Sequence, residues 1–225
     1  MTHTLHRLGN QENLSGDYVV FAMSAKGFNE EGSASSMKRF LEIAYEFDPI
    51  NIGDMKTGNM LTSSKEELVE NVQDVSIVHA VYSDESTVAA VLKRLKEEDL
   101  GISIIVSGLM SKVKEVAESQ HLKQHTVNYS GGIWGKTDLL PSQEVLQLTT
   151  MCGHGMVASN RVEYFASRIR KGKISAEEAA KKLGEPCVCG VFNFERAAKL
   201  LQAMADCEAE RHPMEQGQTI TDESI

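Results

Sequence analysis

The stretch "VSIVHAVYSDESTVAAVLKRLKEEDLGISIIVSG" (75–108) predicts a strand, a helix and a second strand in succession. Residues 75–83 and 102–108 are apolar runs rich in valine and isoleucine, which is typical of strands buried on both faces. Residues 84–101 place apolar side chains at helical spacing and end in Gly101, a residue typical of a helix C-cap. Such a unit is typical of a crossover between parallel strands.

The same alternation of strands and helices continues on both sides of this unit. We therefore predict an α/β fold, with an open, mostly parallel sheet and flanking helices. The alternative is a ferredoxin-like α+β fold, in which strands and helices alternate in a split order. The further strands are predicted at 17–25, 50–55 and 125–129, and the further helices at 33–47, 63–72 and 109–120.

The strand signal ends at Pro141, and only helices are predicted beyond it. These helices cover 142–148, 156–172, 175–184 and 193–210. The sequence thus divides into an α/β domain (1–141), a helical, cysteine-containing subdomain (142–210) and a polar tail (211–225) that we expect to be disordered.

Composition excludes several classes of protein. The chain has 225 residues and a net charge of −9, which argues against nucleic-acid binding. No stretch approaches the roughly 18 apolar residues of a membrane helix, and the N-terminus lacks the apolar region of a secretory signal. We therefore expect no membrane association and a cytoplasmic location, where thiols stay reduced. The sequence leaves open whether the chain forms a homo-oligomer.

All four cysteines lie in the last third of the chain, three of them in the motifs "CGHG" (152–155) and "PCVCG" (186–190). Each motif precedes a predicted helix, whose N–H groups and dipole would favour the thiolate form. Three thiolates and one imidazole are a ligand set that suits a tetrahedral zinc ion or an iron–sulfur cluster. The predicted ligands are Cys152, His154, Cys187 and Cys189.

The fourth cysteine, Cys207, falls late in a helix at amphipathic spacing, and we expect it to be a small buried side chain. The cysteines of the two motifs could also serve only in packing, with His154 bonded to a carbonyl group.

The segment "MCGHG" (151–155) resembles the cysteine motif of the proline racemase family, and "EPCVCG" (185–190) resembles its second motif, Pro-Cys-Gly. The resemblance covers about five residues at the first motif and three at the second. It implies cofactor-free proton transfer by two cysteines on either side of a substrate carbon. Cys152, next to His154, would be one catalytic group, and Cys187 or Cys189 the other. A racemase, epimerase or lyase is therefore the alternative function.

Two glycine-containing loops follow predicted strands, where open α/β sheets bind ligands. They are "SAKGFNEEGSASS" (24–36) and "SGGIWGKT" (130–137), and the second resembles a phosphate-binding loop but begins with serine. We predict a pocket for a small polar or anionic molecule, and a non-catalytic binding protein is the third function considered. The predicted pocket residues are Lys26, Asn29, Ser33, Gly131, Gly132, Trp134 and Lys136. Trp134 could instead plug the contact between the two domains.

Overall fold

A computed structural model describes residues 3–211, and the predicted tail from residue 212 lies outside the described residues. Most predicted elements are present within a few residues of their expected bounds, but 125–129 forms no strand. In chain order the elements are α1 (Gln11–Leu14), β1 (Tyr18–Met23), α2 (Ser33–Tyr45), β2 (Asn51–Asp54), β3 (Gly58–Asn59), α3 (Lys65–Glu70), β4 (Ile77–Tyr82), α4 (Glu85–Glu98), β5 (Ser103–Ser107), α5 (Met110–Ser119), the 3-10 helix η1 (Thr137–Leu139), α6 (Gln143–Thr149), α7 (Ser159–Arg170), α8 (Ala176–Gly184) and α9 (Phe194–Arg211).

The five strands form one sheet in the order β3-β2-β4-β1-β5, and every neighbouring pair is antiparallel. The prediction of a mostly parallel sheet is therefore wrong. Helices α2 and α4 do connect strands that run in the same direction, but another strand lies between the two strands of each pair. The order β2-β4-β1-β5 is the split order of the ferredoxin-like alternative.

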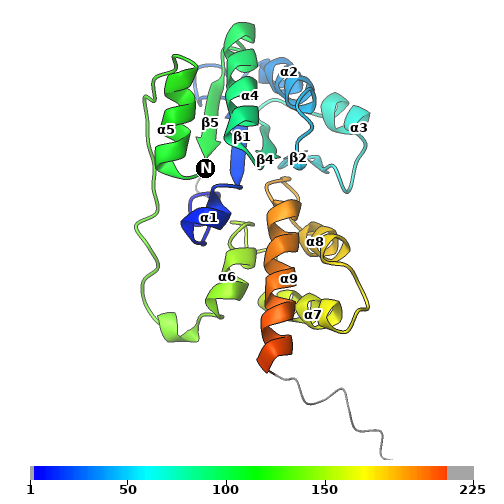
Figure 1. Cartoon of the computed structure of the whole chain (residues 1–225). Coiled ribbons are helices and arrows are strands. Elements are labelled where there is room, and N and C mark those ends of the chain that lie inside the picture. Colours follow the sequence, from blue (N-terminus) through cyan, green and yellow to red (C-terminus); the bar gives the residue numbers. More distant parts are fainter. Residues whose placement is uncertain (1–2, 212–225) are drawn as a thin grey trace, which may run out of the picture.

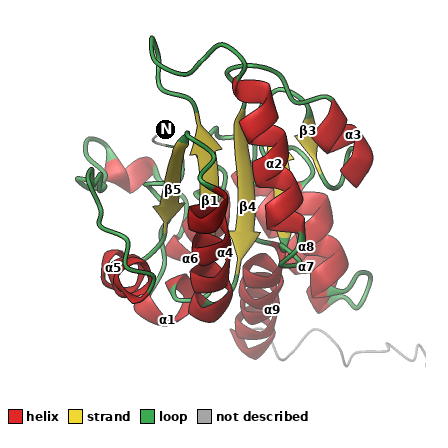
Figure 2. Cartoon of the chain, turned by 90° about the horizontal axis from the view of Figure 1, so that it is seen from above, coloured by secondary structure: helices red, strands yellow, loops and turns green. Residues whose placement is uncertain are grey.

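Both faces of the sheet are covered, which explains the apolar runs that suggested a parallel sheet. Side chains alternate between the two faces of a strand. In β1, Tyr18, Val20 and Ala22 belong to the core under α2 and α4. Val19 and Phe21 belong to the core formed with α6–α9. Figure 1 shows α2, α4 and α5 on one side of the sheet and α6–α9 on the other, and Figure 2 shows the strands from above.

Local signals set several helix ends. Helix α3 begins with a capping box, in which Ser64 and Glu67 exchange side-chain and backbone hydrogen bonds. Helix α4 ends earlier than predicted, with Asp99 rather than Gly101 as its left-handed C-cap. None of the described helices is long and apolar enough to cross a membrane.

A buried ionic cluster joins two layers of the fold. The first layer is the sheet with α2, α4 and α5, and the second layer is α6–α9. Asp17, directly before β1, accepts hydrogen bonds from Arg7, from Arg196 of α9 at 2.7 Å, and from Asn193 at 3.1 Å. The side chains of Arg7, Asp17 and Arg196 are 6%, 0% and 3% exposed. Two cations thus share one carboxylate, which ties the N-terminal segment and α9 to the start of β1.

We predict that Asp17→Asn is strongly destabilising, because it leaves two buried guanidinium groups without a counter-ion. Breaking a buried ion pair costs about 3–5 kcal/mol. Urea unfolding, followed by circular dichroism, measures the change in the free energy of unfolding. The control is Glu118→Gln, which removes one carboxylate of an exposed pair with Lys114 and is expected to change little. Equal losses in the two variants would contradict the prediction.

Candidate functional site

The two cysteine motifs meet beneath the sheet. Cys152 lies in the turn between α6 and α7, and Cys187 and Cys189 lie in the turn between α8 and α9. All three side chains are buried in the same core, and we call them the cysteine cluster. The expectation for Cys207 is wrong, because this residue is exposed on α9 and lies outside the cluster.

Backbone N–H groups point at the three sulfur atoms. The Cys152 sulfur accepts hydrogen bonds from the backbone of His154 and Met156, and the backbone N–H of Val191 bonds to both Cys187 and Cys189. Hydrogen bonds of this kind stabilise a thiolate. These hydrogen bonds come from tight turns. The prediction that helix N-termini supply them is wrong, because α7 begins only at Ser159 and α9 at Phe194.

The thiols also form a chain of hydrogen bonds with one another. The hydrogen bond from Cys152 to Cys187, together with burial, raises the pKa of Cys152 well above its usual range. That bond favours the thiolate of Cys187, but donation to Cys189, with burial, outweighs it and raises the pKa of Cys187 to about 12. The pKa of Cys189, which accepts from Cys187, is lowered. Of the three thiols, Cys189 therefore loses its proton most readily.

Three histidines extend from the cysteine cluster. His154 Nδ1 lies 3.7 Å from Cys189 Sγ. The ring of His3 stacks on that of His154 with centroids 4.8 Å apart, and His3 Nε2 is 3.1 Å from Nε2 of buried His79. Burial, and then the nearby His154, lower the pKa of His3 to about 4, and burial lowers that of His79 well below its usual range. His3 and His79 are therefore neutral at pH 7.

The N-terminal segment covers the cysteine turns, a feature that sequence analysis missed. Arg7 donates hydrogen bonds to the carbonyl oxygens of Met151, at 3.2 Å, and of Val191, each next to a cysteine motif. The backbone N–H of Leu8 donates to Thr150 Oγ1 at 3.0 Å. His3 belongs to no periodic pattern or motif in the sequence, so only its contacts with His154 and His79 show that it is part of the site.

The second cysteine turn is fixed to the sheet. Asn59 of β3 donates to the carbonyl oxygen of Cys187, and Asn51 of β2 to that of Phe192, both at 2.9 Å. Gly190 has φ +74°, and a Cβ there would lie 2.6 Å from the backbone nitrogen of Gly53. Only glycine allows the turn to approach β2 this closely.

The cysteine cluster is not arranged around a common centre. Within residues 3–211, no group of three or more His, Cys, Asp or Glu side chains stands ready to hold a metal ion. The thiols instead hydrogen-bond to one another. The prediction of a zinc ion or an iron–sulfur cluster thus stays a prediction.

The geometry gives little support to a two-cysteine racemase. Proton transfer at a carbon requires that carbon to lie between the two sulfur atoms. Here Cys152 and Cys187 are buried and hydrogen-bonded directly to each other.

The predicted pocket residues of the first loop mostly hold that loop in place. Asn29 accepts from the backbone N–H of Ala25 and donates to the carbonyl oxygen of Gly101, both at 2.6 Å. Ser33 donates to the carbonyl oxygen of Glu30 and accepts from the N–H of Val75. Lys26 is exposed.

The second loop is exposed along its length. Gly131, Gly132 and Lys136 are exposed, and Trp134 is 86% exposed with its ring N–H donating to the carbonyl oxygen of Gly131. Trp134 therefore does not plug a contact between layers. Whether either loop binds a small molecule stays a prediction.

Comparisons with models of protein families, with curated proteins and with solved structures give no match. The assignment of a function therefore rests on the geometry and chemistry of the described residues.

We predict that Gly153→Ala destabilises the protein and opens the cysteine cluster, because the new Cβ would overlap the carbonyl group of His3. Thermal unfolding and the rate of thiol modification by a disulfide reagent measure the two effects. The control is Gly155→Ala in the same motif, where φ is +69° but no atom lies within 4 Å. Left-handed strain alone costs about 1–2 kcal/mol. Equal thiol reactivity in the two variants would contradict a covering role for the N-terminal segment.

Proposed function

We propose that the protein binds a single thiophilic divalent metal ion, with zinc as the first candidate, through Cys152, Cys187 and Cys189, and with His154 as the fourth ligand. The observation that carries the proposal is the meeting of three buried thiols from two turns, with an imidazole beside them. Three cysteines and one histidine form a standard closed set for a structural zinc ion.

Backbone hydrogen bonds offset part of the cost of forming thiolates in the cluster, although the pKa values of Cys152 and Cys187 are raised. Each sulfur accepts at least one backbone hydrogen bond, which lowers the free energy of the charged form. A divalent ion bound by three thiolates and a neutral imidazole has a net charge of about −1. The nearby ionic cluster of Arg7, Arg196 and Asp17 has one positive charge in excess, and Arg7 contacts both cysteine turns. The two charges offset each other.

A metal ion would replace the thiol–thiol hydrogen bonds. Cys152 and Cys187 hold their protons in the arrangement described, and metal binding requires that both be released. Rotation about χ1 of the cysteines would turn the sulfur atoms from one another toward a common ion.

A single ion suits the cluster better than a large group. Cys152, Cys187 and Cys189 are 2%, 0% and 1% exposed, so a large group would find little space beside them. Two hollows on the surface are lined by residues of α7 and the loop after it, and by residues around α4 and β5, and neither is lined by the cysteines. A closed, buried site of this kind is typical of a structural ion.

We predict that protein purified anaerobically contains about one zinc ion per chain, as a closed four-ligand site requires. Elemental analysis of the fresh protein measures the content. Cys187→Ser should lose most of the metal, because it removes the central thiol of the cluster. Cys207→Ser, which changes a cysteine outside the cluster, should retain it.

Two results would contradict the proposal. One is wild-type protein that stays free of metal after anaerobic incubation with zinc. The other is a brown protein with broad absorbance at about 400 nm, which would show an iron–sulfur cluster in place of a single ion.

A further inference from the structure

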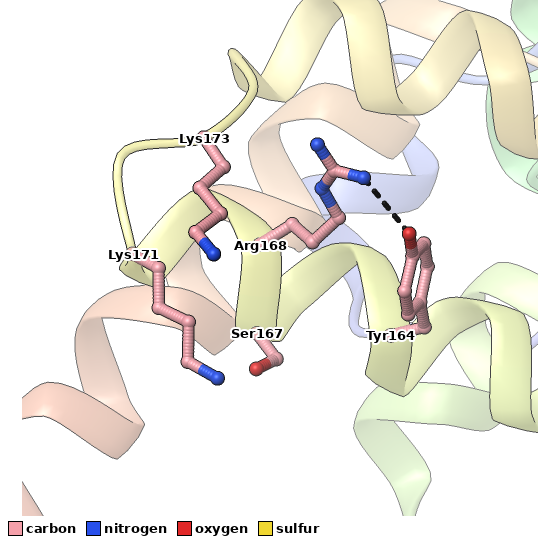
Figure 3. Close-up of a pocket in the computed structure, with 5 residues that line it drawn as sticks. All are labelled: Tyr164, Ser167, Arg168, Lys171 and Lys173. Carbon is pink, nitrogen blue, oxygen red and sulfur yellow. Dashed lines mark hydrogen bonds between the residues drawn. The ribbon is translucent and has the colours of Figure 1, made fainter.

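A second polar site lies at the C-terminal end of α7, apart from the cysteine cluster. The hollow there is lined by Tyr164, Ser167, Arg168, Lys171 and Lys173. Figure 3 shows the side chains of Lys171, Lys173 and Ser167 on one side of the helix end, and the Arg168 guanidinium turned toward the Tyr164 hydroxyl. Three cations and two hydroxyl groups line the hollow, and no carboxylate does.

The cations are not needed to complete the helix end. Backbone N–H groups already satisfy its last carbonyl oxygens: Lys173 N–H donates to Arg168, Gly172 N–H to Ile169, and Lys171 N–H to Ser167, at 2.8 to 3.2 Å. This pattern is a common way to close a helix. The lysine side chains are therefore available to a ligand.

Several other cations on the helices are paired with a carboxylate. Lys182 pairs with Glu178, Arg39 with Glu98, and Lys112 with Glu115. By contrast, Arg168, Lys171 and Lys173 form no ion pair with any carboxylate of the described residues.

Contacts with Tyr164 hold the Arg168 side chain in place, and one N–H donor of its guanidinium group has no partner. It donates to the hydroxyl of Tyr164 at 2.8 Å and lies over the ring of that residue, 5.6 Å from its centroid. Its Nε is buried and lacks a hydrogen-bond partner. A buried N–H group without a partner costs free energy.

We propose that this hollow binds a phosphate group of a small phosphorylated molecule. Arginine and lysine bind phosphate oxygens by charge-assisted hydrogen bonds, and the hydroxyl of Ser167 offers a further donor. A bound dianion would relieve the mutual repulsion of the three cations. The net charge of −9 opposes approach of a polyanion, so a small ligand is favoured over nucleic acid or an anionic membrane. The site is independent of the proposed metal ion.

Isothermal titration calorimetry of the full chain with inorganic pyrophosphate at low ionic strength tests this proposal. We expect saturable binding that weakens as salt is added. The double variant Lys171→Gln/Lys173→Gln should weaken binding at least about tenfold, the loss of two charge-assisted hydrogen bonds. Lys123→Gln, which removes an exposed charge from the loop after α5, should bind like the wild type. Circular dichroism and zinc content should be the same in all variants.

Three outcomes would overturn the proposal. They are no binding at millimolar pyrophosphate, equal affinity in the double variant and the wild type, and equal losses in the double variant and Lys123→Gln. Two further titrations identify the source of the phosphate. Binding to vesicles that contain phosphatidylserine, or to a single-stranded oligonucleotide, that is tighter than binding to pyrophosphate would also overturn the assignment to a small molecule.

Discussion

The carboxylate of Asp17 is the contact on which the arrangement of the two layers depends. It stands directly before β1, and it accepts hydrogen bonds from the N-terminal segment through Arg7 and from the second layer through Arg196 and Asn193. A buried carboxylate is costly unless it is paired and hydrogen-bonded. Here one partner, Arg196, lies 179 positions from Asp17 in sequence, so the charge is fully paired only when these distant segments have come together.

The same ionic cluster connects the fold to the candidate metal site. Arg7 spans the distance between Asp17 and the carbonyl oxygens of Met151 and Val191. Its charge is therefore next to both cysteine turns, and the second arginine leaves the group with a positive excess. In a buried environment such an excess favours a nearby anion. Thiolates of the cysteine cluster, if a metal ion is bound as proposed, would supply this anion, so the charge of Arg7 would favour the proposed site as well as the fold.

The sequence predicts most helices and strands correctly, but it does not predict how the strands are arranged in the sheet. The predicted strands at 75–83 and 102–108 are present as β4 (Ile77–Tyr82) and β5 (Ser103–Ser107), but their apolar runs also suggested parallel neighbours. An antiparallel sheet usually exposes one face and alternates polar with apolar residues. Here α6–α9 cover the second face, so the alternation is absent, and no local pattern shows that a later segment will pack there.

The sequence likewise predicts some residues of the candidate site and misses others. Unusual composition identified the two cysteine motifs, and the structure brings Cys152, Cys187 and Cys189 together. The prediction that helix N-termini favour the thiolates is wrong. Helices α7 and α9 begin a few residues after the two cysteine motifs, and this separates the cysteines from the helix N-termini. Asp17, Arg7 and His3 gave no signal, since single polar residues acquire a role only from contacts with distant segments.

The two cysteine turns rest on different parts of the first layer, which gives a bound ion a definite effect on the fold. The turn of Cys187 is bonded to β2 and β3 through Asn51 and Asn59, whereas the turn of Cys152 lies against the N-terminal segment. An ion shared by the two turns would therefore cross-link these regions through the second layer. Because the ligands meet only in the folded chain, the free energy of metal binding adds to the free energy of unfolding. The proposed ion and the Asp17 cluster would thus both connect the N-terminal segment to the region where α9 begins, one by coordination and the other by ion pairs.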